Sequence, residues 1–394
     1  MKHVIFACAY LAASSAAAMD HSAHMAQEKS NACADSALAC SDKAQPFFDK
    51  DGTLWLAWQG GGRIAVAQSK DGRAFTAPVF VTPRPLRVDV GADSRPQIVR
   101  DAAGVISVIY SVMQTSGFNG RIYLSQSQDE GKTFSPPQPV TDDPASQRFP
   151  ALSLAPNGRT FALWIDKRAA HGAKLPYDGA ALAFSWFDGK GPVPMQVAQD
   201  HSCECCRIAV AFDPRGNPAM MWRQIFSGMV RDHAVMTFAG GRPGAMHRVS
   251  EDKWHIEACP HHGPALAITA DGAYHAAWFT EGEARQGLFY ASSQDAGVRF
   301  STPEAIGSRA NNPGRAQLLA VGNDLWLAWQ EFDGETVSIL AKRRRGSGWT
   351  APRVVATTTD ASDHPVLTAR GTQAYLSWLT TKEGYRLIAL ESEP

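Results

Sequence analysis

Two short segments of the chain concentrate cysteine and histidine. They are His201–Cys206 and His255–His262. The chain has 12 histidines and 7 cysteines, and eight of these 19 residues lie within the 14 residues of the two segments. Thiolate sulfur and imidazole nitrogen bind soft or borderline ions such as Cu(I) and Zn(II), whereas Ca²⁺ and Mg²⁺ prefer oxygen. The candidate ligands are Cys203, Cys205, Cys206, Cys259, His261 and His262. Their concentration predicts a soft-metal or redox centre, for copper first and for zinc as the alternative.

A second ligand-rich patch follows an apparent export signal. Met1-Lys2-His3 precede the apolar run Val4–Ala13, and small residues then end at Ala18, which is typical of a cleaved secretory signal too short to span a membrane. Cleavage after Ala18 would leave a free amine with His21 in third position, an arrangement that binds Cu(II) or Ni(II). We therefore expect a periplasmic or secreted protein with a possible second metal patch at His21, His24 and Met25.

The segment that carries this patch, Met-Asp-His-Ser-Ala-His-Met, resembles the Met/His repeats of periplasmic copper-resistance proteins. That resemblance implies copper as the ion. The alternative interpretation is a polar leader that binds nothing.

Structural disulfides are the competing interpretation of the cysteines. Six remain once the signal is removed, and an even number in an oxidising compartment is typical of disulfide-bonded proteins. Cys33 and Cys40 could pair, and two bridges could form among the cysteines of the ligand-rich segments. The sequence does not choose between these bridges and a metal centre.

Seven copies of one strand pattern must position these segments. Each copy is an apolar strand that ends in an aromatic residue, and from Trp58 to Trp378 the spacing averages about 53 residues, within the range of propeller blades. A shorter apolar strand and a Gly or Asn turn precede each copy, and another strand follows. Such four-stranded units bury both faces only by stacking around an axis. The pattern predicts an all-β propeller, with seven blades favoured and six possible.

A turn motif identifies the type of blade. Ser127–Phe134 and Ser293–Phe300 both read Ser-x-Asp-x-Gly-x-x-Phe, and Ser69–Phe75 is one residue shorter. The aspartates, Asp71, Asp129 and Asp295, can accept hydrogen bonds from their own turns, while the glycine supplies a positive φ and the aromatic side chain packs between blades. The motif is the Asp box, and the chain from about residue 45 to residue 394 resembles the Asp-box propellers of the sialidase (neuraminidase) superfamily. We expect the domains to be a signal over 1–18, a leader over 19–44 and the propeller over 45–394.

The first strand of each blade lines the channel of a propeller, so the residues that begin it lie at one mouth of the ring. Five of these residues are basic or imidazole-bearing: Arg95, Arg148, Arg207, Arg315 and His364. They predict a site for a small acidic or glycan ligand, because guanidinium forks suit carboxylates. The alternative is that the arginines pair with carboxylates of the chain itself.

The sialidase resemblance implies a specific chemistry, in which three arginines grip the substrate carboxylate, an Asp acts as acid/base, and a Glu activates a nucleophilic Tyr. Arg148-Phe149-Pro150 looks like the family's Arg-Ile-Pro element, and Arg207 and Arg315 could supply the other guanidiniums. However, the element lies in the third copy rather than the first. Tyr385 and Glu331 are the nearest available Tyr and Glu, and nothing in the sequence pairs them. We therefore favour a non-catalytic binding protein, with an exo-sialidase as the alternative.

Composition limits the partners. Lys plus Arg and Asp plus Glu are each 38, so the chain has no net charge to attract nucleic acid. No later apolar run is long enough to span a membrane. A protein-binding or assembly role remains a further alternative to metal or glycan binding.

Overall fold

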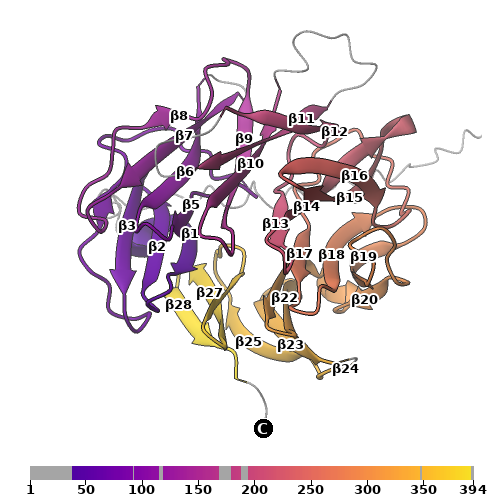
Figure 1. Cartoon of the computed structure of the whole chain (residues 1–394). Helices are drawn as coiled ribbons and strands as arrows, with labels where there is room; N and C mark the ends of the chain where they lie inside the picture. The colour runs from indigo at the N-terminus through magenta and orange to yellow at the C-terminus, as the bar shows by residue number, and fades with distance from the viewer. Residues whose placement is uncertain are drawn as a thin grey trace, which may run out of the picture.

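The computed structural model describes residues 38–391 apart from 92, 115–118, 168–178, 188–193 and 347. Within these residues the chain is built from antiparallel β-strands and three short 3₁₀ turns, with no α-helix (Figure 1). The three turns are η3 (Leu38–Cys40), η4 (Ser227–Met229) and η5 (Arg309–Asn311). The expected signal over 1–18 and the patch at His21, His24 and Met25 lie outside the described residues.

The strands form successive antiparallel groups along the chain. The first two groups are β1 (Ser41–Phe48), β2 (Leu54–Gly60), β3 (Arg63–Ser69) and β4 (Val79–Phe80), followed by β5 (Gln97–Arg100), β6 (Ile106–Met113), β7 (Gly120–Ser127) and β8 (Gln138–Pro139). Strand β1 thus begins just ahead of the boundary expected at residue 45.

The middle of the chain forms one sheet of eight strands. Its members are β9 (Gln147–Leu154), β10 (Thr160–Asp166), β11 (Ala180–Phe187), β12 (Gln196–Ser202), β13 (Ala209–Phe212), β14 (Pro218–Phe226), β15 (Val230–Ala239) and β16 (Arg242–Arg248). Strands β12 and β14 pair at a single position, Ser202 with Gln224, and this pair joins β9–β12 to β13–β16.

Three more sheets complete the described chain. They comprise β17 (Ala265–Ile268), β18 (Tyr274–Glu281), β19 (Gln286–Ser293) and β20 (Glu304–Ile306); then β21 (Gly314–Val321), β22 (Asp324–Phe332), β23 (Val337–Arg345), β24 (Gly348–Trp349) and β25 (Arg353–Thr358); and finally β26 (Val366–Arg370), β27 (Gln373–Thr380) and β28 (Gly384–Ala389). The last sheet has three strands.

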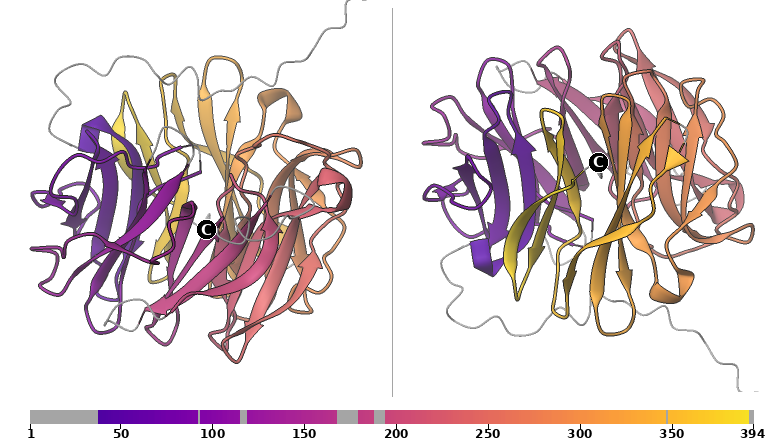
Figure 2. Two further views of the ribbon diagram at one scale, coloured as in Figure 1. Left: turned by 90° about the horizontal axis from the view of Figure 1, so that it is seen from above. Right: turned by 90° about the horizontal axis from the view of Figure 1, so that it is seen from below.

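The sheets stand around a common middle, as the views from above and below show (Figure 2). Their first strands contact one another in cyclic order, β1, β5, β9, β13, β17, β21, β26 and back to β1. The amino-terminal and carboxy-terminal sheets therefore adjoin. All seven aromatic-tipped segments of the sequence are strands, and each is the second strand of its group, which confirms that part of the prediction: β2, β6, β10, β14, β18, β22 and β27.

Burial explains why the second strands are apolar throughout. Neighbouring sheets cover both faces, so the largest fully buried side chains are tryptophans at equivalent positions: Trp58, Trp164, Trp222, Trp278, Trp329 and Trp378. A buried indole N–H needs an acceptor. Trp329 donates to Glu331 at 2.9 Å, and Trp222 donates to Gln224 at 2.7 Å.

The Ser-x-Asp turns close the outer side of three groups. Asp129 accepts hydrogen bonds from Ser127 Oγ and Thr133 N at 2.8 and 2.9 Å, and Asp295 does the same with Ser293 and Arg299. Asp71 accepts from Arg73 N and Ala74 N at 2.8 and 2.9 Å. The bonds from Thr133 lower the pKa of Asp129 to about 2. The aromatic residue Phe134 packs into the apolar core between the first two groups.

Candidate metal centre

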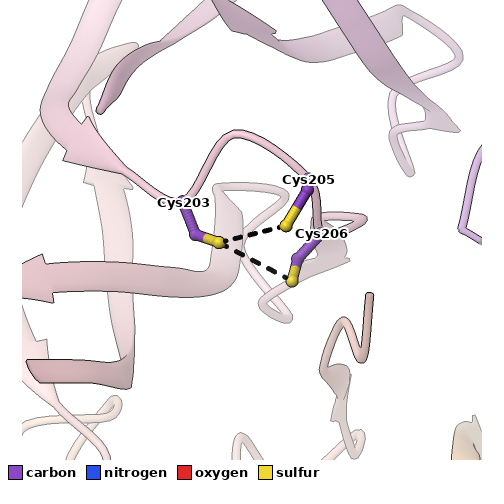
Figure 3. Close-up of side chains that lie close together, drawn as sticks. All are labelled: Cys203, Cys205 and Cys206. Carbon is purple, nitrogen blue, oxygen red and sulfur yellow. Dashed lines mark hydrogen bonds between the residues drawn. The ribbon is translucent and has the colours of Figure 1, made fainter. Parts of the chain in front are cut away.

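The loop that follows β12 brings three thiols together. Cys203 N donates to Arg223 O on β14 at 2.9 Å, which fixes the start of the loop at the join between β12 and β14. The Cys203 sulfur lies 3.5 Å from that of Cys205 and 3.9 Å from that of Cys206 (Figure 3). All three side chains are buried within the apolar core that contains Trp222.

The loop between β16 and β17 adds two more ligands. The ligand atoms of Cys205, Cys259 and His261 lie within 4.8 Å of one another, and those of Cys203, Cys205 and Cys206 form a second such group. His261 is held in place because its Nδ1 lies 3.0 Å from the carbonyl oxygen of Cys205. The structure thus brings together five of the six residues expected as ligands, although the two loops are about 50 residues apart in sequence.

His262, the sixth expected ligand, belongs to neither group. Its ring stacks on Phe279 with 4.2 Å between ring centroids, and burial holds the pKa of His262 well below its usual value. Its carbonyl oxygen accepts a hydrogen bond from Arg223. The residue therefore packs beside the centre.

The guanidinium of Arg231 faces the thiols, and no sequence pattern pointed to it. Its Nη1 donates to Cys203 Sγ at 3.3 Å. Hydrogen bonds from the thiols of Cys205 and Cys206, together with Arg231, lower the pKa of Cys203, whereas donation to Cys203 raises the pKa of Cys205. The geometry thus favours a single thiolate, on Cys203, within the group of three.

The disulfides considered as the alternative for the ligand-rich segments are not formed. Cys203, Cys205, Cys206 and Cys259 are all free thiols. Cys33, and with it the expected Cys33–Cys40 bridge, lies outside the described residues.

The basic residues expected at the channel mouth lie at the start of first strands or two residues before them, and they pair with carboxylates of the chain. Asp93, which has no exposed side-chain surface, lies 3.3 Å from Arg315 Nη1, 3.6 Å from Arg207 Nη1 and 3.7 Å from His364 Nδ1. It also accepts a hydrogen bond from Gly263 N at 2.7 Å. We call these five residues the Asp93 hub.

The two remaining arginines have separate partners. Arg148 donates two hydrogen bonds to Asp89, from Nε to Oδ2 at 2.7 Å and from Nη2 to Oδ1 at 3.0 Å. Arg95 donates to Asp363 at 3.1 Å, and Lys43 donates to the same carboxylate at 3.0 Å. The arginines therefore divide among three carboxylates, Asp89, Asp93 and Asp363, none of which the sequence patterns singled out.

The Asp93 hub adjoins the two cysteine-bearing loops along the chain. Arg207 directly follows Cys206, and Gly263 directly follows His262, so Asp93 binds the residue that ends each loop. Arg315 also donates to the carbonyl oxygen of His261. Asp93 therefore holds the two cysteine-bearing loops in register.

A Tyr–Glu pair of the sialidase type is not formed by the two candidates. The Tyr385 hydroxyl accepts from Ser377 Oγ at 3.0 Å and its ring packs on Phe75. Glu331 accepts from Ser308 N and Trp329 Nε1, both at 2.9 Å. The two residues are engaged in different sheets.

Within the described residues, no helix is long and apolar enough to cross a bilayer.

Comparison with known proteins supports the fold alone. No family model matches the chain, and no curated protein matches it, so the likeness to copper-resistance proteins finds no support there. Among solved structures, an ulvan lyase of polysaccharide lyase family PL25 is 12% identical with a TM-score of 0.59, covering 88% of this chain and 91% of that one. The polysaccharide lyase Uly1 is 9% identical with a TM-score of 0.56, covering 89% and 88%.

A sialidase also appears among the matches, at a lower score. The NanB sialidase from Streptococcus pneumoniae is 10% identical with a TM-score of 0.48, covering 75% of this chain and 66% of that one, which is too distant to carry an argument. At these identities the two lyase matches support the β-propeller fold alone and say nothing of activity.

Proposed function

We propose that this chain is an exported, non-catalytic seven-bladed propeller of the Asp-box type that binds a soft metal ion at Cys203, Cys205, Cys206, Cys259 and His261. Copper is the proposed ion and zinc the alternative. Seven blades are supported by the cyclic contacts of seven first strands. Export rests on the signal expected over residues 1–18.

The observation that carries metal binding is the spacing of the sulfurs. Two thiolates on one ion, each at about 2.3 Å from the metal, lie about 3.8 Å apart. The observed separations are 3.5 and 3.9 Å. A disulfide instead requires its sulfurs at about 2.05 Å. The described thiols are thus spaced for a metal ion, and three sulfurs from one loop suit Cu(I).

Glycan hydrolysis receives less support from the residues. Its carboxylate-binding arginines, Arg148, Arg207 and Arg315, are engaged by Asp89 and Asp93, and its Tyr and Glu candidates lie apart. A protein-docking role has little support either, because large exposed apolar side chains in the described part of the chain lie on separate elements: Phe80, Val197, Val298 and Val354.

The test is metal retention by the reduced protein. Mature protein is titrated with Cu(I) under argon against a chromophoric Cu(I) chelator, with free thiols counted before and after. We expect the protein to take Cu(I) from the chelator and to lose thiol reactivity as it does so. Cys203→Ser should weaken retention at least tenfold.

His255→Ala is the matched control. His255 lies in the second ligand-rich segment but contacts Gly228 O and solvent rather than the thiols, so its loss should leave retention unchanged. Protein that leaves all Cu(I) and all Zn(II) with the chelator would contradict the proposed function.

A further inference from the structure

The two groups of ligand atoms share one residue, Cys205. Cys203, Cys205 and Cys206 form one group, and Cys205, Cys259 and His261 form the other. The groups differ in exposure: the side chains of Cys203 and Cys206 are buried, whereas Cys259 is exposed and His261 is half-buried. One group thus faces the core and the other faces solvent.

A single ion does not fit all five ligands. Ligands of one tetrahedral ion all lie within about 4 Å of each other, because metal–sulfur and metal–nitrogen bonds are about 2.0–2.3 Å long. Here the ligand atoms form two sets of three, and the atoms of each set lie within 4.8 Å of one another. Three ligands are also a complete set for Cu(I), which accepts low coordination numbers with sulfur.

We propose that the centre holds two Cu(I) ions bridged by the Cys205 thiolate, an outer ion that exchanges with solvent and an inner ion that is stored. This rests on the proposed function. The outer site consists of Cys205, Cys259 and His261, and the inner site consists of Cys203, Cys205 and Cys206. Each thiol that binds gives its proton to solvent.

Charge permits the second ion. Four bound thiolates carry four negative charges, two of which two Cu(I) ions compensate, and net charge beside an apolar core is costly. The Arg231 guanidinium, 3.3 Å from Cys203 Sγ, and the buried Arg223 supply positive charge on the protein side. Two Cu(I) ions with these two arginines bring the buried assembly to neutrality.

The shared sulfur also supplies a path inward. An ion held by Cys205 and Cys259 can gain Cys203 or Cys206 before it releases Cys259, since the Cys203 sulfur lies only 3.5 Å from that of Cys205. The ion is then never without a thiolate ligand. Loading should therefore proceed from the exposed site to the buried one.

The experiment compares Cu(I) stoichiometry and uptake rate among variants of the mature protein, with the probe Cu(I) presented on a chromophoric chelator. Wild-type protein should take up two ions per chain. Cys259→Ser and His261→Ala each remove an outer ligand, so both variants should retain one ion and load at least tenfold more slowly. Cys205→Ser should retain neither ion at a chelator concentration that leaves wild type loaded.

His255→Ala is the control and should bind two ions at the wild-type rate, and far-UV circular dichroism checks that each variant is folded. The use of two outer-site variants keeps the test decisive if one of them misfolds. Saturation of wild type at one ion, or loss of both ions from the outer-site variants, would overturn the shared-sulfur proposal while leaving metal binding intact. Failure of wild type to bind any Cu(I) would instead remove the proposed function itself.

Discussion

Burial keeps His275, a histidine outside the two cysteine-bearing loops, in its neutral form. His275, on β18, is 5% exposed and hydrogen-bonds through Nδ1 to the Tyr290 hydroxyl at 2.8 Å and through Nε2 to Thr269 Oγ1 at 3.2 Å. Burial, followed by the nearby Arg344, lowers the pKa of His275 to about 4. The folded protein thus keeps this ring neutral at pH values where an unfolded chain protonates it.

That difference predicts a loss of stability in acid. Above the unfolded pKa of about 6.5 the ring is neutral in both states and its contribution is fully present. As the pH falls from about 6.5 toward 4, only the unfolded state gains the proton, so the free energy of unfolding should drop by about 3 kcal/mol from this residue. Urea unfolding at several pH values measures the drop.

His275→Gln keeps hydrogen-bonding groups without a titratable ring, and its pH dependence over this range should be shallower than that of wild type. Identical slopes in the two proteins would contradict the assignment.

Turns between strands determine how closely the sheets pack. Gly131, in the turn after β7, has φ of 79°, and a Cβ there would lie 2.8 Å from the Trp55 ring on the neighbouring sheet. Gly216, in the turn between β13 and β14, has nearly the same φ of 81°, but a Cβ added there would meet no atom within 4 Å. Gly131 is thus required both by a positive φ and by a close contact, whereas Gly216 is required only by a positive φ.

Alanine variants of these two glycines separate the cost of a positive φ from the cost of the contact with Trp55. Gly216→Ala should lower the free energy of unfolding by about 1 kcal/mol, because alanine disfavours positive φ. Gly131→Ala should cost about 2 kcal/mol or more, since the added methyl also displaces Trp55. Chemical denaturation of both variants measures the difference, and equal losses would show that sheet packing tolerates the methyl group.

Elements were more predictable than contacts. The apolar strands that contain Trp164 and Trp278 follow from period and composition, because each must be covered on both faces. The nearness of Cys205 to Cys259 also followed, since both loops precede first strands of successive copies. The paired carboxylates did not: Asp93 lies in an irregular segment, and its partner Arg315 is 222 residues away. Long-range ion pairs leave no periodic pattern in a sequence.

At the scale of the whole molecule, the Asp93 carboxylate joins segments that lie at the start of different strand groups. Asp93 precedes β5, and its partners Arg207, Gly263, Arg315 and His364 precede or begin β13, β17, β21 and β26. Asp363 makes a similar link between the two ends of the chain, because it binds Lys43 on β1. These contacts tie the sheets together at their inner edges.

Removal of the Asp93 carboxylate should therefore weaken both the fold and the proposed metal site. Asp93→Ala leaves the half-buried guanidiniums of Arg207 and Arg315 without their carboxylate, which costs roughly 3 kcal/mol in the free energy of unfolding. Because Asp93 holds the residues that end both loops, Cu(I) retention should also fall at least tenfold at a temperature where the variant is folded. Thermal unfolding and chelator competition measure the two effects.

Asp142→Ala, at an exposed position, is the control and should change neither quantity. Added formate should partly restore the stability of Asp93→Ala, since a small carboxylate can occupy the place of the missing side chain. Unchanged metal retention in Asp93→Ala would show that the loops hold their register without the hub.

The recurrence of a buried tryptophan has an optical consequence. Six strand groups carry the indole at the same depth, whereas the second group carries Tyr110 there instead. Emission from the protein is therefore an average over nearly the whole ring, and its red shift on unfolding reports the loss of the entire assembly rather than of one sheet. Trp222 alone among these six shares a core with Cys203, Cys205 and Cys206. A metal ion held by those sulfurs would quench Trp222, one of the chain's eleven tryptophans, and so lower the emission intensity in part without shifting its wavelength.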